Sequence, residues 1–515
     1  MPPRLVLKAE AGRSLFWSGC LSLLAGLAQA LSIAAPWNGQ PLWWLQWLSL
    51  GVLAWQLEHC MSWRRAAVLG GVFAGAWLAG TFWWMFISMH TYGGLPAPLA
   101  AAAVLALAAV LALYYAAACA LFVRLAPVNR AGRAIFFAAL WLLAELARGC
   151  WFTGFGWGGA GYAHVDGPLA GYAPWLGVYG ISAIAAWLAM TVPQAWACGP
   201  WQRVAALAVL ALPSVYQAGA LEASTSTGRL QVALLQGNIP QDEKFQPGSG
   251  VPTALRWYGE QLGANRAALV VAPETALPLL PQQLPDGYWA ALTKRFASGE
   301  QAALIGMPWG SFSEGYTNAV VGFKPDQASA WRYDKHHLVP FGEFIPTGFK
   351  WFTAMMNIPL GDFNRGGLGQ PSFAWQGQRL APNICYEDLF GEELGARFTD
   401  PATAPTVFVN LSNIAWFGNT VAIDQHLHIS RMRSLEFARP FVRATNTGAT
   451  AIIDHQGRVT AALPRHTRGV LRGEVEGRQG LTPYAWWVSH FGLWPLWGAA
   501  LFVLGLVLRK TLSKT

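Results

Sequence analysis

Charged side chains are scarce in this chain. Asp, Glu, Lys and Arg make up 12% of its 515 residues, while hydrophobic residues make up 54%. An ordinary soluble protein carries roughly 25% charged residues. The shortage excludes such a protein and predicts one that lies in a membrane. The formal net charge of +9 would suit nucleic acid, but basic clusters interleaved with aromatic residues are lacking, so we expect no nucleic-acid partner.

Cysteine pairs and metal-ligand spacings are lacking as well. Of the six cysteines, only Cys385 belongs to the more polar part of the chain, and the others lie in or beside apolar segments: Cys20, Cys60, Cys119, Cys150 and Cys198. These positions give neither a disulfide framework nor a zinc spacing. The adjacent His336 and His337 would point apart on a regular element. We expect neither a metal nor a cofactor.

Long apolar runs organise the chain. Eight runs approach the length that crosses a bilayer as a helix, although two are short, at roughly residues 14–35, 41–57, 66–89, 97–123, 134–147, 173–196, 204–220 and 485–508. We expect residues 1–222 to form seven membrane helices, 223–482 a soluble domain, and 483–515 the last helix and a cytoplasmic tail. A signal peptide cleaved near Ala28-Gln29-Ala30 is the alternative for the first run, which continues to Ala35 and so favours a retained anchor.

Basic residues lie beyond alternate runs. They follow the second, fourth, sixth and last runs, as Arg64, Arg65, Arg124, Arg130, Arg133, Arg203, Arg509, Lys510 and Lys514, whereas residues 36–41 and 90–98 carry none. Basic loops face the cytoplasm, so alternation places residues 223–482 on the opposite side. We expect a multi-pass protein of a bacterial inner membrane, with its soluble domain in the periplasm.

One loop is rich in glycine and aromatic residues. Residues 148–173 contain Gly149, Gly154, Gly156, Gly158, Gly159, Gly161, Gly167 and Gly171 with Trp151, Phe152, Phe155, Trp157, Tyr162 and Tyr172. Such a loop suits either an interfacial belt with tight turns or a surface that contacts a substrate, with Trp157 as a candidate. Nearby Glu145 and Arg148 are expected to pair with each other or to meet lipid head groups.

Between about Gly228 and Arg478 the apolar runs become shorter and alternate with polar segments. Short apolar runs predict strands, and three longer patterns predict helices, at roughly 252–262, 288–298 and 424–437; the strands are expected at 231–236, 267–272, 303–307, 319–323, 380–385, 406–411, 449–453 and 470–475. Many of these runs lack strict alternation, as strands covered on both faces do. The order predicts an α/β domain with layered sheets.

Cys385 stands where a predicted strand, residues 379–384, meets the start of a predicted helix. Unpaired N–H groups and the helix dipole at such a junction favour a thiolate. A buried structural cysteine is the alternative. The polar residues Tyr386, Glu387 and Asp388 follow directly and suit the wall of a site better than a core. We therefore take Cys385 as a candidate nucleophile.

Two further segments offer partners for this thiol. Glu274 ends an apolar strand, so partial burial would raise its pKa toward the range of a general base, although a solvated loop position is equally compatible. Lys335 lies in a polar cluster between apolar and proline positions and could stabilise an oxyanion, with Glu343 orienting it. Taken alone, Lys335 fits a solvated loop as well.

Together these segments resemble a known family. Pro273-Glu274, Tyr333-Asp334-Lys335-His336-His337-Leu338-Val339-Pro340-Phe341-Gly342-Glu343 and Asn383-Ile384-Cys385-Tyr386-Glu387 resemble the Glu, Lys and Cys motifs of the nitrilase superfamily. Set between membrane segments, they resemble its membrane-embedded branch, the apolipoprotein N-acyltransferases. The resemblance implies an αββα sandwich, with Glu274 as base, Lys335 as oxyanion stabiliser and Cys385 as the nucleophile that forms a thioester. It also makes Glu343, Tyr386 and Glu387 supporting residues.

Two loops match the family less closely. Ile414, in the segment 410–418 that contains Trp416, stands where an aspartate is common, and Phe245 follows the loop 237–241 where a tryptophan is frequent. The resemblance makes Phe245 and Trp416 candidates for substrate binding. Apolar residues at 351–356 and at 416–417 are candidates for a lid that excludes water.

The resemblance also implies a reaction. An acyl chain from a membrane phospholipid would pass to Cys385, and then to the α-amine of the N-terminal S-diacylglyceryl-cysteine of an apolipoprotein, without a cofactor. A membrane-anchored hydrolase that uses the same residues and water as the acceptor is the alternative. A channel or transporter is disfavoured, because ionisable residues within the apolar runs are few.

Overall fold

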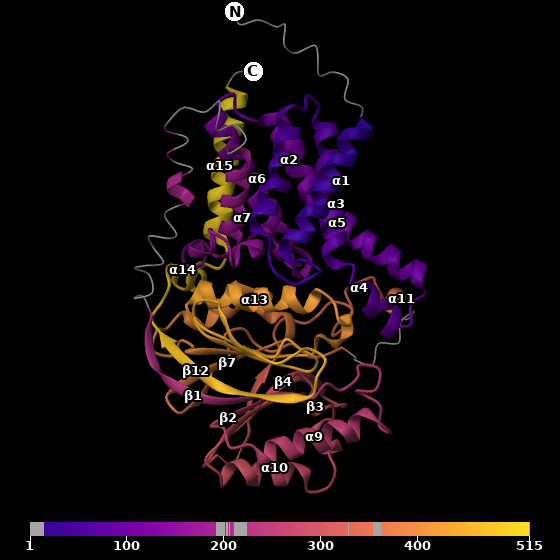
Figure 1. Cartoon of the computed structure of the whole chain (residues 1–515), viewed down its shortest axis with the longest axis vertical. Coiled ribbons are helices and arrows are strands. Elements are labelled where there is room, and N and C mark those ends of the chain that lie inside the picture. Colours follow the sequence, from indigo (N-terminus) through magenta and orange to yellow (C-terminus); the bar gives the residue numbers. More distant parts are fainter. Residues whose placement is uncertain are drawn as a thin grey trace, which may run out of the picture.

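The protein consists of a helical bundle above a two-sheet domain (Figure 1). The computed structural model describes residues 15–191, 201, 204, 207–210, 224–327, 329–353 and 362–513. The bundle contains α1 (Leu15–Ile33), α2 (Trp43–Glu58), α3 (Trp63–Phe82), α5 (Ala97–Leu125), α6 (Arg130–Cys150), α7 (Ala173–Thr191) and α15 (Trp494–Leu512). The start of α1 and the end of α15 both lie at the end of the bundle that is remote from the sheets (Figure 1).

Six of the described helices are long and apolar enough to cross a membrane. They correspond to α1, α3, α5, α6, α7 and α15, extended in two cases by a short turn. The predicted run at 41–57 forms α2, which has 16 residues. Most of the predicted run at 204–220 lies outside the described residues, as does the predicted domain boundary at 222–223. The sequence prediction of about eight helices is consistent with this bundle.

The soluble domain is built on two six-stranded sheets. The first has the order β12 (Gly469–Gln479), β1 (Thr225–Gln236), β2 (Leu269–Ala272), β3 (Ala302–Ser311), β4 (Gly315–Phe323) and β5 (Trp331–Asp334). The second has the order β11 (Val459–Ala462), β10 (Ala451–Ile453), β9 (Phe441–Thr445), β8 (Val407–Ser412), β7 (Gln378–Ile384) and β6 (Phe373–Trp375). Strands β1, β2 and β3 are parallel, as are β7, β8 and β9.

Apolar side chains from both sheets meet between them. Leu234 and Val271 of the first sheet and Val409 and Val442 of the second are fully buried in one cluster. Because helices cover the outer faces too, the central strands are buried on both sides, which explains why their sequences lack alternation. The expected α/β sandwich of layered sheets is confirmed.

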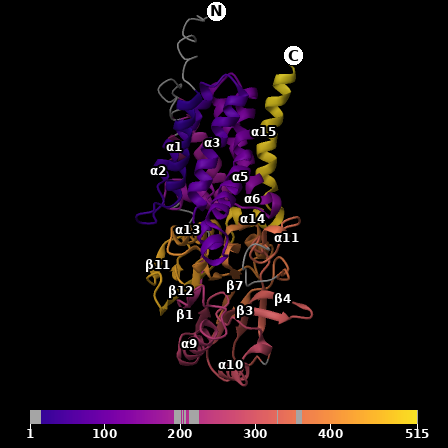
Figure 2. The same ribbon diagram turned by 90° about the vertical axis from the view of Figure 1, so that its right-hand side faces the viewer.

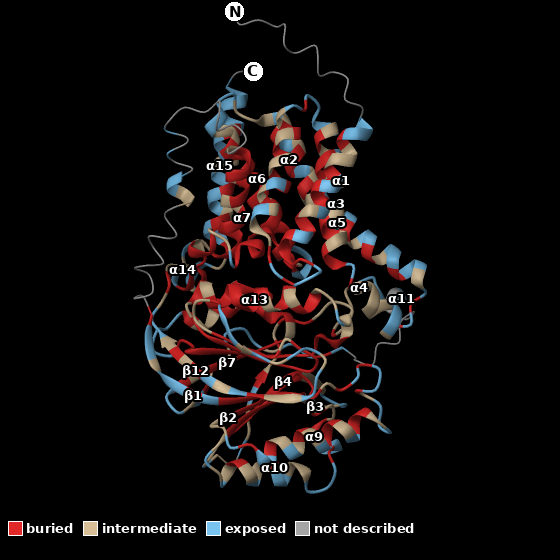
Figure 3. Cartoon of the chain, viewed as in Figure 1, coloured by how far each residue is buried: buried red, intermediate tan, exposed pale blue. Residues whose placement is uncertain are grey.

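The two outer helical layers differ. Helices α9 (Gly250–Ala264) and α10 (Tyr288–Ala297) cover the first sheet and expose their other faces, whereas α13 (Ala422–Phe437) covers the second sheet and lies beneath the bundle (Figures 1 and 3). The view turned by 90° shows the same order of layers (Figure 2). Helix α13 is therefore buried on both sides, although its sequence is rich in polar residues.

Polar residues of α13 bind the bundle. The Gln425 Oε1 atom accepts hydrogen bonds from the indole Nε1 atoms of Trp157, at 2.8 Å, and Trp84, at 3.0 Å. Glu436 Oε1 accepts a bond from the Val178 N–H at 2.7 Å. Unpaired polar groups in such an interface would cost about 1–3 kcal/mol each, so these bonds fix the sandwich against the bundle.

Candidate active site

Three strand ends deliver the motif residues. Glu274 comes two residues after β2, Lys335 directly after β5, and Cys385 directly after β7. Strands β2 and β5 belong to the first sheet and β7 to the second. The residues therefore meet at one edge of the sandwich, because β2 and β7 both run toward that edge. This is the position in which α/β folds commonly hold their functional residues.

Glu274 is held by three donors. Its Oε1 atom accepts hydrogen bonds from Asn318 Nδ2 at 2.8 Å and from Lys335 Nζ at 3.4 Å, and its Oε2 atom accepts one from the Asn413 N–H at 2.9 Å. The Glu274 residue is 8% exposed. The carboxylate is consequently fixed in one orientation while it remains within reach of a group in the site.

Lys335 is fully buried between two carboxylates. Its Nζ atom donates to Glu343 Oε1 at 2.8 Å, closer than to Glu274. Burial alone would lower the pKa of Lys335, but Glu343 and Glu274 outweigh it and raise that pKa. The ammonium group therefore stays protonated, as a group that stabilises an oxyanion must.

Cys385 differs from its sequence-based expectation in one respect. It is the first residue of η8 (Cys385–Leu389), a short 3-10 helix, and its φ of 55° lies in the left-handed region. Burial, followed by the nearby Glu274 charge, raises the pKa of the Cys385 thiol to about 12, although Lys335 opposes this. The junction alone therefore does not favour a thiolate here, because this short turn offers less stabilisation than desolvation costs. The thiol needs a base, and Glu274 is the adjacent carboxylate.

The backbone carbonyl of Cys385 is fixed by side chains of β8 and α13. It accepts hydrogen bonds from Asn410 Nδ2 at 2.8 Å and from the His426 imidazole Nε2 at 3.2 Å. His426 Nε2 also lies 3.0 Å from Asp388 Oδ1, and its Nδ1 accepts a bond from Arg443 Nη2 at 3.1 Å. Since Gln425, which binds the bundle, is the neighbour of His426, α13 links the membrane helices to Cys385.

Glu387 joins the lysine and cysteine segments. Its carboxylate accepts bonds from the backbone N–H groups of His336 at 2.7 Å, His337 at 3.0 Å and Ile384 at 2.6 Å, and from the Tyr333 hydroxyl at 2.9 Å. These donors lie on both sides of the site, so Glu387 fixes Lys335 and Cys385 relative to each other.

Like Glu387, Tyr386 contacts the segment that carries Lys335. Its hydroxyl donates to the Leu338 carbonyl at 3.0 Å, and its ring centroid lies 6.0 Å from Lys335 Nζ. Through these contacts Tyr386 packs against the lysine and holds the segment that follows it.

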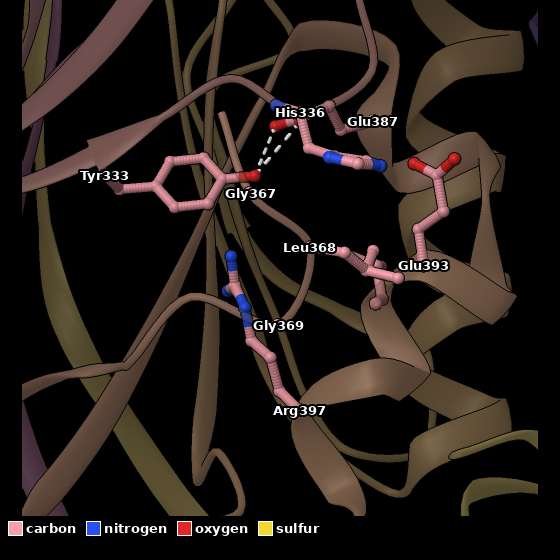
Figure 4. Close-up of a pocket in the computed structure, with 9 residues that line it drawn as sticks. Tyr333, His336, Gly367, Leu368, Gly369, Glu387, Glu393 and Arg397 are labelled. Carbon is pink, nitrogen blue, oxygen red and sulfur yellow. Dashed lines mark hydrogen bonds between the residues drawn. The ribbon is translucent and has the colours of Figure 1, made fainter. Parts of the chain in front are cut away.

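A small pocket adjoins Glu387 on the side of β5. Tyr333, His336, Glu387, Glu393 and Arg397 point into it, with the Tyr333 hydroxyl bonded to Glu387 (Figure 4). Glu274, Lys335 and Cys385 are not among its nine lining residues. The pocket therefore adjoins Glu387, which supports the site, and is not lined by the three motif residues themselves. No group of three or more His, Cys, Asp or Glu side chains in the described part of the chain could hold a metal ion.

Comparisons with known proteins identify the family of this chain. Residues 25–191 match a family model described as the apolipoprotein N-acyltransferase N-terminal domain, and residues 231–484 match one described as carbon-nitrogen hydrolase. An apolipoprotein N-acyltransferase of Verminephrobacter eiseniae is 62% identical over 94% of this chain and 95% of its own length, and one of Ralstonia nicotianae is 46% identical over 94% and 92%. The chain belongs to the apolipoprotein N-acyltransferase family.

One solved structure resembles part of this chain, at a much lower sequence identity. A carbon-nitrogen hydrolase from Helicobacter pylori is 16% identical, with a TM-score of 0.34, and covers 52% of this chain and 94% of its own.

The predicted substrate-binding residues of this apolipoprotein N-acyltransferase family member occupy different environments. Phe245 and Trp416 are half-buried, and Trp416 packs edge-on against Tyr92 of η1 (Ser88–Tyr92), with ring centroids 5.9 Å apart. Trp157 is only 3% exposed and bonds to Gln425. Substrate contact by these residues stays a prediction, and the packing of Trp157 suits support of the site better.

Other sequence predictions have clear structural counterparts. Glu145 and Arg148 pair with each other at 3.3 Å, and Arg148 Nη1 also donates to the carbonyls of Phe155 and Trp157, which closes the glycine-rich loop. Ile414 is 2% exposed, so this departure from the family pattern adds to the core. Of the predicted lid, Trp351 is 63% exposed, and residues 354–356 lie outside the described residues.

Sequence reasoning missed several residues of the site. Asn318 binds both Glu274 and Glu343 at 2.8 Å, Asn413 binds Glu274 and Gln241, and Lys244 donates to the Glu274 carbonyl. Asn413 lies in a segment that the family motif already marked, so it could have been found. Asn318 within a strand and Lys244 in a charged loop carry no such signal.

Proposed function

We propose that this protein transfers an acyl chain from a membrane phospholipid, through a thioester on Cys385, to the α-amino group of the N-terminal S-diacylglyceryl-cysteine of apolipoproteins. The observation that carries the proposal is the meeting of Glu274, Lys335 and Cys385 beneath a membrane bundle, in a chain that belongs to this family. The names of the relatives give the class of reaction.

The first half-reaction forms the thioester. Glu274 takes the proton of the Cys385 thiol as the sulfur attacks the carbonyl carbon of the phospholipid ester. Lys335 stabilises the negative oxygen of the tetrahedral intermediate, and its raised pKa keeps it charged for this purpose. The intermediate then collapses, the ester C–O bond breaks, and Glu274 returns its proton to the leaving lysophospholipid alkoxide.

The second half-reaction releases the thiol. The neutral α-amine attacks the thioester carbonyl, and Glu274 accepts a proton from the nitrogen. The C–S bond breaks as the amide forms, and the Cys385 thiolate regains its proton from Glu274. Because the first product leaves before the amine attacks, the proposal requires ping-pong kinetics.

A membrane bundle suits these substrates. Both are anchored by acyl chains, and each buried methylene contributes about 0.8 kcal/mol to staying in the bilayer. An enzyme that acts on both substrates therefore has to bring its thiol to the membrane surface. The position of α13 directly below the bundle supports this arrangement (Figure 1).

The proposed orientation places the sandwich in the periplasm and the chain in a bacterial inner membrane. It rests on the asymmetry of the basic loops. Reporter fusions after Glu222 and after Thr515 should report opposite sides, the first periplasmic and the second cytoplasmic. Reporters that agree with each other would contradict the orientation.

The reaction is tested with purified protein, a phospholipid with a labelled acyl chain and a diacylated lipopeptide. The account predicts that most of the label appears as N-acylated lipopeptide. Label released mainly as free fatty acid would instead favour a hydrolase that uses water as the acceptor.

A further inference from the structure

The motif residues leave a charge imbalance in the site. Glu274 and Glu343 both lie within 3.4 Å of Lys335 Nζ, and both are less than 9% exposed. Two buried carboxylates then face one ammonium group. A buried charge without a partner is costly, so the surroundings should supply a second cation.

Lys244 lies where this second cation is needed, next to Glu274. It is 2% exposed, and its Nζ atom donates to the backbone carbonyl of Glu274 at 3.1 Å. It also interacts electrostatically with the Glu274 carboxylate and with Cys385. Lysine is rarely buried without a reason, and neither the supporting contacts nor the two half-reactions described above use this one.

The loop that carries Lys244 is attached to the same carboxylate. Gln241 Oε1 accepts a hydrogen bond from Asn413 Nδ2 at 2.8 Å, and the Asn413 N–H donates to Glu274 Oε2. The Lys244 N–H in turn donates to the Pro240 carbonyl at 2.9 Å. Lys244 is thus fixed by its own turn and by a contact with the residues that hold Glu274.

We propose that Lys244 is a positioning residue that holds Glu274 through its carbonyl and supplies the second positive charge of the site when the Cys385 thiolate forms. The proposal rests on the acyl-transfer function proposed above. Glu274 and Glu343 carry two negative charges and Lys335 one positive charge, so protonated Lys244 brings the sum to zero. Transfer of the Cys385 proton to Glu274 leaves that sum unchanged.

The protonation of Lys244 responds to its neighbours. Burial lowers the pKa of Lys244 to about 7, while Glu274 and Cys385 oppose this effect. A thiolate at Cys385 strengthens that opposition and favours the charged amine. Lys244 therefore stays charged while the thiolate exists.

The test measures the reactivity of the thiol itself. Cys385 is alkylated with iodoacetamide over a range of pH in wild type, Lys244→Met and Lys244→Arg, and the adduct is quantified by mass spectrometry. The matched control is Lys294→Met, the same chemical change at an exposed position of α10. Glu274, Glu343, Lys335 and Arg443, charged groups that interact with the thiol, are the same in all four proteins.

Lys244→Met should slow alkylation about tenfold at each pH near neutrality, because removal of a nearby cation raises the pKa of the thiol and lowers the thiolate fraction. Lys244→Arg should restore most of the rate, and Lys294→Met should match wild type. A thermal unfolding midpoint for each protein reports whether it has folded.

Two results would overturn the inference. One is a Lys244→Met profile that coincides with wild type. The other is a slower rate in Lys244→Met that Lys244→Arg does not restore, because this would mean that Lys244 acts through packing alone. If Lys244→Met does not fold, Lys244→Arg decides, since loss of thiol reactivity in that charged variant also contradicts the proposal. Normal alkylation in wild type without acylation by phospholipid would refute the proposed function and leave this inference standing.

Discussion

The floor of the active site and its rim are built from different contacts. The floor consists of Glu274, Asn318, Lys335, Glu343 and Asn413, which are buried and joined by hydrogen bonds of 2.8–3.4 Å. We take as the rim three half-buried aromatic residues, Phe245, Trp416 and Phe417. Of these, Trp416 packs against Tyr92 and Phe417 against Trp84, both in the N-terminal part of the chain. A rigid polar floor suits chemistry, whereas an aromatic rim suits acyl chains.

The difference predicts separate kinetic effects. Changes in the floor should lower the rate of the chemical step, because they disturb groups that act in the transition state. Changes in the rim should mainly weaken the binding of lipid and leave the thiol reactive. The following variants test this separation in order of expected effect.

Glu274→Gln should have the largest effect. It keeps the size of the side chain but removes the base, so the buried thiol loses the group that accepts its proton. We expect acylation of Cys385 to slow by about 10²- to 10⁴-fold. Single-turnover acylation with phospholipid measures the rate, and the unfolding midpoint checks the fold. A rate near wild type would show that the activating base lies elsewhere.

Glu343→Gln should have a smaller effect that depends on pH. The pKa of Lys335 is raised mainly by Glu343 against burial, so the ammonium is lost only when the pH rises through that high value. Without the Glu343 charge this pKa falls, and the alkaline limb of the rate profile should move to lower pH. We expect a loss of roughly 10- to 100-fold that grows with pH. A loss that is constant with pH would contradict this role of Glu343.

Trp416→Ala should have the smallest effect, and the effect should fall on KM instead of on the chemical step. Loss of part of an apolar contact with lipid, about 1 kcal/mol, should raise the KM for phospholipid about fivefold, with kcat little changed. Phe312→Ala, in the turn between β3 and β4 where Phe312 is 74% exposed, is the control and should match wild type. A fall in kcat without a change in KM would place Trp416 with the floor.

Much of the floor was predictable from sequence because its residues stand in motifs. Glu274, Lys335 and Cys385 each end a strand, and a strand end is visible as an apolar run that stops at a polar residue. The layered sheets followed from the same runs. The family resemblance added the supporting role of Glu387, since neither spacing nor composition places that side chain beside the strand ends.

The remaining features depend on tertiary contacts. The protonated thiol of Cys385 follows from desolvation and from the charge of Glu274, neither of which a local pattern reveals. Lys244 belongs to a stretch that reads as solvated, and only the fold shows it buried. Likewise, the polar sequence of α13 gives no sign that Gln425 and His426 are covered on both sides.

The central claim is that the acyl chain passes through Cys385. Purified protein incubated with phospholipid alone should carry a hydroxylamine-sensitive acyl group on the peptide that contains Cys385, and a diacylated lipopeptide should then remove it with formation of the N-acylated product. Cys385→Ala should carry no such group. An acyl group that persists in Cys385→Ala, or lipopeptide product formed by that variant, would contradict the account.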